Sequence, residues 1–384
     1  MFRSSAGRRE AAGLLLRCWS LTVGPRTLTT PSRPLHTSRL FSISAPAELR
    51  PPLKRWDLEV SPFSTVRARL GCSISVRPLD PHDFPEADRA FITVHRTDTE
   101  QEEGVGLDDL QVHYDEQSKE LLISAEKVDS SVLIDVAAPI KSNLFIATQG
   151  KGNVQVKKMD CDICKVQTEK GNCWLHSVKS HRVEVQSRGG HVTGAGTIHG
   201  DVDISTCGDS AVDVKKLQGT KMNVSTERGS LKVKAIYAES TCVSSCSGKV
   251  ELGHLHGNAT VTNVSGDTVI DGSNSFLKVS SHSGGIDVYV GDGGSAEIHS
   301  QDGAVCVRVP SSLKAGVELC GASVDISPEV VLHGVENNTT EGQTTVTGFM
   351  NGKSAAEHRV KARADRGSVR LKTQSWFESL KLGS

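Results

Sequence analysis

Apolar and polar residues alternate along the middle of the chain in a pattern that repeats about every 19 residues. Most repeats start with a glycine and have apolar residues two and four positions later, as in Gly152 with Val154 and Val156. Alternation with a period of two residues is typical of β-strands that bury one face. The repeat starts are Gly152, Gly171, Gly190, Ser210, Gly229, Gly248, Gly266, Gly284 and Gly303, which lie 19, 19, 20, 19, 19, 18, 18 and 19 residues apart.

A second alternating stretch lies about 12 residues after each glycine, for example Val202 to Ile204. Two short strands cannot bury an apolar face alone, so neighbouring repeats must stack. The sequence therefore predicts an all-β fold, a single-stranded β-solenoid (β-helix or β-roll) with coils of about 19 residues over residues 137–330. The inward lane expected from this register is Val154, Cys173, Val192, Val212, Leu231 and Val250.

Proline separates the repeats from the flanks, since ten of the thirteen prolines precede residue 86 and none lies between Ile140 and Val309. Proline lacks the N–H that a central strand needs, so the proline-free stretch fits continuous sheet. A solenoid needs caps because its end coils expose unpaired strand edges. We therefore expect a β cap over residues 49–136 before the repeats.

After residue 330 the repeat pattern breaks, and we expect an inserted hairpin or loop over residues 331–358. The strand-like stretches Val346 to Met350 and Arg359 to Ala362 flank the turn residues Asn351-Gly352, which predicts that these two strands pair. The repeat signature returns once more within residues 359–384, which are expected to form the final coil and the C-terminal cap. The apolar residues expected to cover this end are Trp376, Phe377 and Leu380.

Charge is distributed unevenly along the chain. The first 45 residues contain seven arginines, no lysine and one acid, Glu10, which gives +6; the whole chain has a net charge of −1, so the remainder carries −7. An arginine-rich, acid-poor start is typical of a mitochondrial presequence, expected over residues 1–48. Arg39, Phe41 and Ser44 fit a two-step matrix processing site with a mature start near Leu49. The alternative is a secretory signal peptide.

The remaining composition excludes some classes of partner. No cluster of lysine and arginine follows residue 45, which argues against nucleic acid. No run approaches the ~20 apolar residues of a membrane-crossing helix, so no transmembrane segment is expected. Only 4% of the residues are aromatic, which argues against a bulky globular core.

Two runs carry a resemblance to a known family. One is Ile134 to Ile140 with its Val-Ala-Ala-Pro-Ile stretch, and the other is Ile146-Ala-Thr-Gln-Gly-Lys-Gly-Asn-Val-Gln-Val156. With these runs and the repeats after them, residues 130–372 resemble the "putative-adhesin" (head-GIN-like) β-solenoid domain family. The whole chain also resembles a vertebrate family defined by sequence similarity. The resemblance implies the fold and no particular chemistry.

One group of residues has the spacing of a zinc site. Cys161-x-x-Cys164 and Cys173-x-x-His176 are two close pairs of soft ligands, as tetrahedral zinc requires. The repeat register argues for a different interpretation, since Cys173 occupies the inward place of Val154 and a thiol packs there as a small apolar group. Buried core cysteines are the favoured interpretation, and no cofactor is expected.

Two further groups lie in line along the predicted coils. His199, Gln218, Tyr237 and His256 share one corner, and the two histidines are too far apart to bind one ion. Glu184 and Asp203 are expected one coil apart on an outward face, where two carboxylates could serve a retaining glycosidase. No phosphate-binding loop or GxSxG motif accompanies them.

The sequence thus favours a non-enzymatic scaffold or binding module that presents solenoid faces to a protein partner. The alternative is a carbohydrate-active β-helix enzyme using Glu184 and Asp203. The sequence does not identify the partner.

Overall fold

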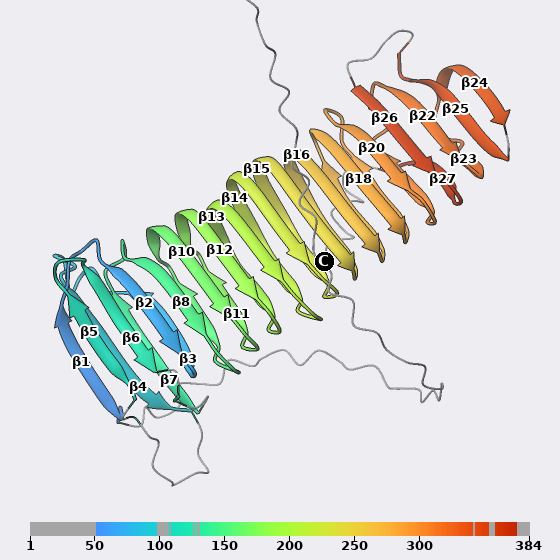
Figure 1. Ribbon diagram of the computed structural model, residues 1–384. Coiled ribbons are helices and arrows are strands. Elements are labelled where there is room, and N and C mark those ends of the chain that lie inside the picture. Colours follow the sequence, from blue (N-terminus) through green and yellow to red (C-terminus); the bar gives the residue numbers. More distant parts are fainter. Residues whose placement is uncertain are drawn as a thin grey trace, which may run out of the picture. The chain divides into compact units, whose positions relative to one another are not determined.

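The computed structural model describes residues 51–97, 107, 109–125, 127–128, 131–340, 342–352 and 358–374. These residues form 27 β-strands and no helix, and the strands belong to the unit Arg50–Ser384. The structure is therefore the all-β solenoid that the repeats predict (Figure 1). The presequence expected over residues 1–48 lies outside the described residues, as do Trp376, Phe377 and Leu380.

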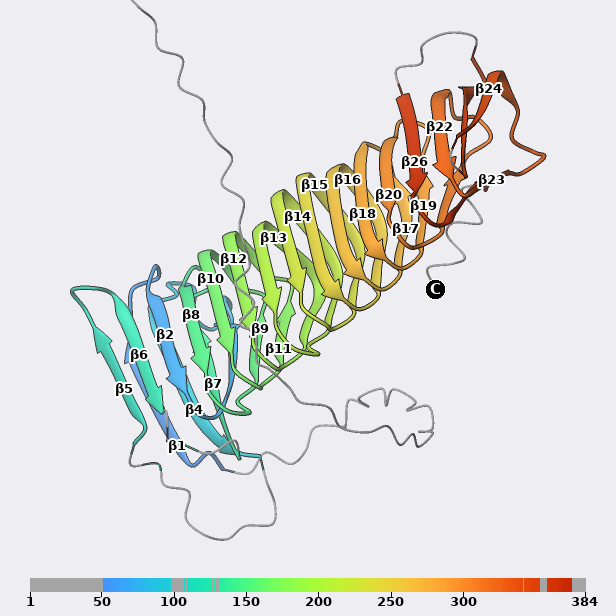
Figure 2. The ribbon, with the colours of Figure 1, turned by 45° about the vertical axis from the view of Figure 1, so that its right-hand side comes forward.

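Each coil contributes one strand to each of two faces, which we call sheet 1 and sheet 2 (Figure 2). In spatial order, sheet 1 contains β5 (Gln111–Asp115), β6 (Glu120–Ala125), β2 (Thr65–Leu70), β8 (Asn143–Thr148), β10 (Asp160–Thr168), β12 (Lys179–Ser187), the second halves of β13 (Val192–Thr206), β14 (Val212–Thr226), β15 (Leu231–Ser247) and β16 (Val250–Ser265), then β18 (Phe276–Ser283), β20 (Ser295–Ser300), β26 (His358–Ala364), β22 (Ala315–Gly321), β25 (Gln343–Met350) and β24 (Leu332–Thr340).

Sheet 2 contains the other half of each coil. Its strands, in the same direction along the stack, are β1 (Lys54–Glu59), β4 (Arg89–Arg96), β7 (Val132–Ala138), β3 (Ser73–Pro78), β9 (Val154–Lys157), β11 (Cys173–His176), the first halves of β13 to β16, then β17 (Thr268–Ser273), β19 (Ile286–Val290), β21 (Val305–Val309), β27 (Ser368–Thr373) and β23 (Ser323–Ile326).

The register of the central coils is the one expected from the repeat. Cys173 pairs with Val154 on one side and with Val192 on the other, and the lane continues in register through the next three coils. Its members are 0–1% exposed: Val154, Cys173, Val192, Val212, Leu231 and Val250. The predicted inward lane is confirmed, and it lies in a narrow apolar core between the two sheets.

The repeated glycine has a steric cause at the corner between sheet 1 and sheet 2. A Cβ atom added at Gly171 would stand 1.8 Å from the carbonyl oxygen of Gly152, and one at Gly190 would stand 1.9 Å from that of Gly171. Real Cβ atoms essentially never approach backbone so closely. Because successive coils stack corner on corner, eight of the nine repeat starts are glycine, and Ser210 is the exception.

A buried lane of hydroxyl groups lies beside this corner on sheet 1. Thr148 donates to the carbonyl oxygen of Gly152 at 2.8 Å, and Ser187 donates to that of Gly190 at 2.6 Å. Ser300 accepts from the N–H of Gly303 at 2.9 Å. These corner backbone groups have no partner in a neighbouring strand, because the chain turns there. The hydroxyl groups supply their hydrogen bonds inside the core.

The stacking order departs from the sequence order at both ends. The coil β2–β3 is inserted between β6–β7 and β8–β9, with all these pairings parallel. At the other end, β26–β27 is inserted between β20–β21 and β22–β23. The coil that is last in the sequence is therefore next to last in space, and residues 49–136 supply solenoid coils as well as edge strands.

Antiparallel strands complete both ends. β4 and β1 extend sheet 2 beyond β7, and β5 extends sheet 1 beyond β6. At the C-terminal end β25 pairs antiparallel with β22 and with β24. The pairing expected between Val346–Met350 and Arg359–Ala362 is wrong, because β25 uses both its edges for β22 and β24 while β26 pairs parallel with β20 and β22.

Candidate binding surface

The four residues with zinc-site spacing lie on two different sheets. Cys161 and Cys164 are on β10 of sheet 1, and Cys173 and His176 are on β11 of sheet 2. The three thiols are 0–4% exposed. Burial raises the pKa of Cys161 to about 11 and that of Cys173 to about 12, and it raises the pKa of Cys164 well above the usual range. Burial thus favours the neutral thiol, as expected of cysteines that pack in the core.

His176 does not approach the thiols as a ligand would. Its ring stacks on Trp174 with 5.4 Å between centroids, and the Trp174 ring also receives Lys157 Nζ at 5.5 Å from its centroid. Across the residues that the structure describes, no three His, Cys, Asp or Glu side chains are gathered closely enough to hold a metal ion.

The histidine corner is a continuous lane across four coils. His199 pairs with Gln218, Gln218 with Tyr237, and Tyr237 with His256. Tyr237 is 40% exposed, and its ring stacks on His256 at 4.4 Å between centroids with 8° between the ring planes. Lys216 Nζ lies 4.7 Å from the centroid of the same ring. The lane lines a shallow surface hollow of about 550 Å³ and offers a rigid aromatic group beside sheet 1.

Glu184 and Asp203 are paired one coil apart on the outer face of sheet 1, where the sequence placed them. Glu184 contacts Lys165 at 2.9 Å and Arg182 at 2.5 Å. The hydrogen bond from Lys165 is the main cause that holds the pKa of Glu184 below its usual range. A general acid of a glycosidase needs a raised pKa, so the surroundings of Glu184 favour an ion pair rather than that role.

The outer face of sheet 1 carries an uncharged surface over β15 and β16. In sheet 1, four side chains of each strand point outward, and all eight are small and neutral although 23% of the chain is charged. Six of the eight residues are serine, threonine or cysteine. Seven of the eight side chains are exposed, and Ser244 is half-buried. We call this surface the neutral patch; its residues are Ser240, Cys242, Ser244 and Cys246 on β15 and Asn258, Thr260, Thr262 and Val264 on β16.

The outer face of sheet 2 over the same coils is different. Asp213, Lys232 and Glu251 follow one another in register, and Lys232 Nζ lies 3.7 Å from Glu251. Lys249 also pairs with Glu251, and its hydrogen bond is the main cause that lowers the pKa of the Glu251 carboxyl. Such a face of alternating charges is well solvated, so the neutral patch distinguishes one face of the central coils from the other.

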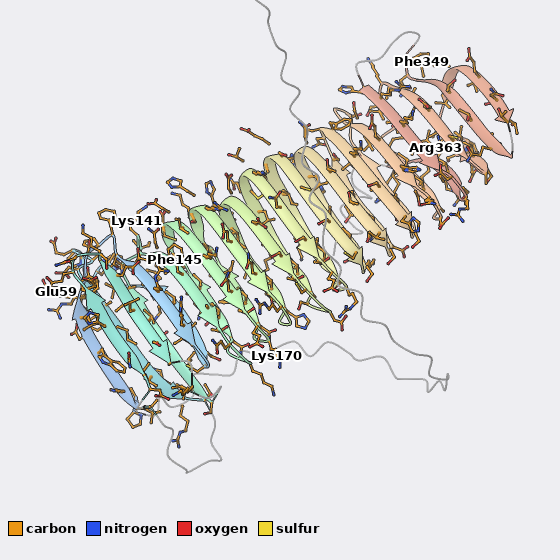
Figure 3. All side chains as sticks on the ribbon, in the orientation of Figure 1. Glu59, Lys141, Phe145, Lys170, Phe349 and Arg363 are labelled. Atoms are coloured by element: carbon orange, nitrogen blue, oxygen red, sulfur yellow. The ribbon has the colours of Figure 1, made fainter. Side chains whose placement is uncertain are left out.

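Charged and large side chains border the neutral patch on sheet 1. Phe145 on β8 and Arg363 on β26 extend from this sheet farther along the stack, several strands from the patch on either side of the central coils (Figure 3). Phe276 on the neighbouring β18 is 42% exposed, and Lys278 on the same strand lies 3.8 Å from Glu297. Protein interfaces share two of these features, a centre depleted in charged residues and a polar rim.

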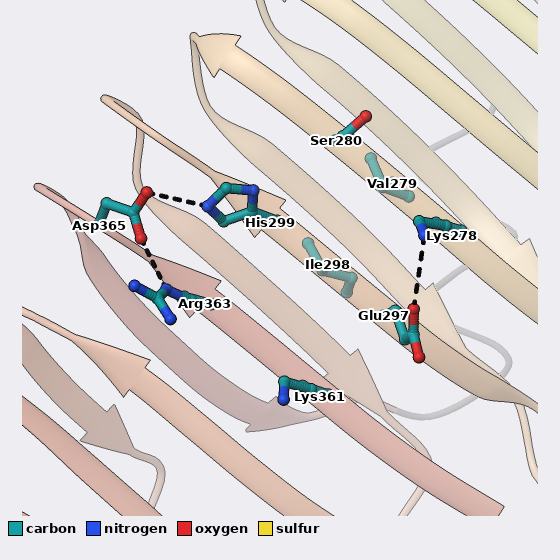
Figure 4. Close-up of a pocket in the computed structure, with 9 residues that line it drawn as sticks. All are labelled: Lys278, Val279, Ser280, Glu297, Ile298, His299, Lys361, Arg363 and Asp365. Carbon is teal, nitrogen blue, oxygen red and sulfur yellow. Dashed lines mark hydrogen bonds and ion pairs between the residues drawn. The ribbon is translucent and has the colours of Figure 1, made fainter.

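A hollow of about 460 Å³ lies on sheet 1 beyond the patch, over β18, β20 and β26 (Figure 4). His299 Nε2 lies 3.0 Å from Asp365, which also accepts from Arg363 Nε at 2.7 Å. Ser280 is one coil away from His299, but its hydroxyl is hydrogen-bonded to Thr262 at 3.3 Å. The serine therefore lacks the bonded base that an activated nucleophile needs.

Sequence reasoning missed the neutral patch although its signal was present. The alternation shows which residues of β15 and β16 point outward, and none of those in the sheet 1 halves, Ser240–Cys246 and Asn258–Val264, is charged. The repeat register also places these two strands side by side, as the structure confirms.

Comparison with known proteins supports the fold. Residues 195–372 match the model of a family described as Toastrack DUF4097, which extends from β13 to β27. This match supports the resemblance to the adhesin-type β-solenoid family over that part of the chain. The resemblance of the whole chain to a vertebrate family stays a prediction.

Three bacterial crystal structures are also similar to this chain. A "putative adhesin" from Parabacteroides merdae is 15% identical with a TM-score of 0.41, covering 68% of this chain and 97% of its own. A "putative cell adhesion protein" from Clostridium sporogenes is 12% identical with a TM-score of 0.15, covering 84% and 99%. A "putative adhesin" from Bacteroides fragilis is 12% identical with a TM-score of 0.27, covering 84% and 96%. Since these TM-scores are below 0.5, nothing further rests on them.

Proposed function

We propose that this protein is a non-enzymatic binding module or scaffold that docks a protein partner on the neutral patch of sheet 1. The observation that carries the proposal is the absence of charge from the eight side chains that β15 and β16 direct outward from sheet 1. Interface centres are depleted in charged residues, because burying an unpaired charge is costly. Serine, threonine and cysteine also lose little side-chain freedom when they are covered.

The corner beside the patch supplies a second part of the same surface. Tyr237 is on β15, a few residues before Ser240, so the aromatic ring stands at the border of the patch. Its stacking on His256 and the cation of Lys216 hold the ring in place before a partner arrives. Rigid tyrosines are frequent hot spots of protein interfaces, since little freedom remains to be lost on binding.

The partner that fits this surface is a protein with a flat, uncharged contact area. Nothing in the surroundings of Glu184 and Asp203 favours the alternative of a carbohydrate-active enzyme. Glu184 is held as a carboxylate by Lys165 and Arg182. The described residues contain no helix with the length and hydropathy of a membrane span.

The test compares two matched substitutions of small outward residues. Ser244→Lys places a charge in the neutral patch, and Thr193→Lys places the same charge on the outer face of sheet 2. In cells, proximity labelling from the wild type and from Thr193→Lys should recover a partner protein. Labelling from Ser244→Lys should not recover it. An identical set of labelled proteins for both variants would contradict the proposed surface.

Exposed cysteines provide a second readout with the purified partner. Cys242 and Cys246 stand on the patch, whereas Cys207 is exposed elsewhere. The bound partner should slow the reaction of a maleimide with Cys242 and Cys246 and leave that of Cys207 unchanged. Equal rates at the two patch cysteines with and without the partner would place the contact elsewhere.

We also propose that the protein is imported into mitochondria, with the matrix as its destination. The support is the sequence of residues 1–48, which is rich in arginine and contains a single acid before residue 45.

A further inference from the structure

The C-terminal end of sheet 1 finishes in a long exposed strand. β24 pairs with β25 alone among the described residues, so one of its edges is open. Every residue of β24 after Leu332 is exposed, including Val335, which is 48% exposed. An open edge presents a row of backbone N–H and C=O groups that can pair with another strand.

The other three edges of the two sheets carry the features that prevent strand pairing. β1 follows Pro51 and Pro52 and has four charged residues among its six. β23 has only four residues and is soon followed by Pro328, and β5 has only five. Prolines, charges and short length are the usual protection of edge strands. β24 has nine residues, no proline and one acid, Glu336.

The part of β24 that can pair regularly with another strand begins after an irregularity in its register with β25. The pairing of β24 with β25 shifts between His333 and Glu336, where Gly334 has a φ of +63°. From Glu336 to Thr340 the pairing with β25 is regular. Thr340 pairs with Gln343 at the turn, and in an antiparallel pair alternate residues point their N–H and C=O away from the partner strand. Asn337 and Thr339 therefore direct these groups to the open edge.

We propose that β24 pairs antiparallel with β24 of a second copy of this chain, across a two-fold axis that passes Asn337. In this register Asn337 faces its own equivalent, Val335 faces Thr339, and Glu336 faces Asn338. No two like charges meet, and a β-branched pair lies on each side of the axis. The outward N–H and C=O groups of Asn337 pair with those of its equivalent, which gives two backbone hydrogen bonds at the axis, and those of Thr339 face the other chain on either side.

A two-fold arrangement uses the same surface on both copies, so pairing closes at two chains and buries both open edges. Val335, exposed in the single chain, is then covered by Thr339 of the other copy. This dimer leaves the neutral patch free, because the patch lies on β15 and β16 and not on β24.

The test measures the mass of the full chain by sedimentation equilibrium over a wide range of concentration. The wild type should rise from one to two chains as the concentration increases. Thr339→Pro should remain a monomer, because proline removes an outward N–H while the hairpin with β25 keeps its own bonds. Thr339→Val keeps the N–H and should dimerise as the wild type does.

A second variant guards against misfolding of the proline variant. Asn337→Lys places two ammonium groups side by side at the axis and should weaken the dimer at least tenfold at low salt, with partial recovery at high salt. A wild type that is monomeric at every concentration would overturn the proposal, and so would a dimer that survives both substitutions. Ser244→Lys should dimerise normally, which separates this result from the test of the neutral patch.

Discussion

Gly367 lies against Gly303 in the neighbouring coil, although β22 to β25 separate the two residues along the chain. A Cβ atom added at Gly367 would stand 2.2 Å from the carbonyl oxygen of Gly303. Gly367 thus continues the series of corner glycines beyond Gly303. β22 and β23 are stacked beyond this coil, which locks it inside the solenoid.

The close contacts between corner glycines predict that two glycine-to-alanine variants differ strongly in stability. In Gly303→Ala the new Cβ would stand 1.7 Å from the carbonyl oxygen of Gly284, so the coils must separate at this corner. We expect a loss of about 3 kcal/mol or more in the free energy of unfolding. In Gly293→Ala the nearest atom is at 3.4 Å, and the loss should be small. Urea denaturation of both variants measures the difference; equal stabilities would mean that the corners tolerate side chains.

The burial of Arg308 predicts that breaking its ion pairs costs more stability than breaking an exposed ion pair. Arg308 is 2% exposed, contacts Asp287 and Asp271, and donates to Gln374 at 2.9 Å. Arg308→Met leaves these partners without a cation and should cost about 3 to 5 kcal/mol of stability. Arg370→Met breaks an exposed pair and should cost less than about 1 kcal/mol. Thermal unfolding measures the loss of stability in both variants. A small loss in Arg308→Met would show that the contacts of Arg308 contribute little to stability.

The buried thiols predict that the protein does not depend on zinc. Cys164→Val keeps an apolar side chain of similar size in the core, whereas Cys164→Asp buries a carboxyl group. We expect the valine variant to be much more stable than the aspartate variant. Metal analysis of the purified protein should find well under one equivalent of zinc. Stoichiometric zinc that is lost in both variants would restore the metal-site interpretation.

Glu184 predicts a specific acid sensitivity. Its pKa is lowered in the folded protein, chiefly by the hydrogen bond from Lys165, so the carboxylate stabilises the fold above the pKa of the unfolded chain, about 4.3. This contribution is lost as the pH falls through the lower, folded pKa. Glu184→Gln should therefore destabilise the protein near neutral pH and lose less stability than the wild type on acidification. Parallel stability curves from neutral to acidic pH would show that Glu184 contributes nothing.

The presequence predicts the destination of a reporter. Residues 1–48 fused to a fluorescent protein should direct it to mitochondria, because the segment is strongly basic with one acid before residue 45. Replacing Arg3, Arg8 and Arg9 by glutamine should reduce import. Secretion of the fusion, or its diffuse distribution in the cytosol, would contradict the proposal.

Most of the central solenoid could be predicted from single residues and their spacing. Leu231 and Val250 are both inward and in register, as the repeat requires. The candidate site could be predicted only in part. The pairing of Glu184 with Asp203 followed from the register, but the contacts of Glu184 with Lys165 and Arg182 depend on how long side chains lie across neighbouring strands.

The sequence by itself determined which residues are buried in each coil, because strict alternation places every second side chain of a strand in the core. It also determined where most of the corners lie, since glycine recurs where a side chain would meet the carbonyl oxygen of the neighbouring coil. The tertiary structure alone decided the order of the coils at the two ends. Coils with the same inward pattern offer the same ladder of backbone groups, so pattern alone does not distinguish which coil is the neighbour of β20–β21. The choice depends on the whole fold: β26–β27 occupies that place, Gln374 binds the buried Arg308, and β24 is left at the edge.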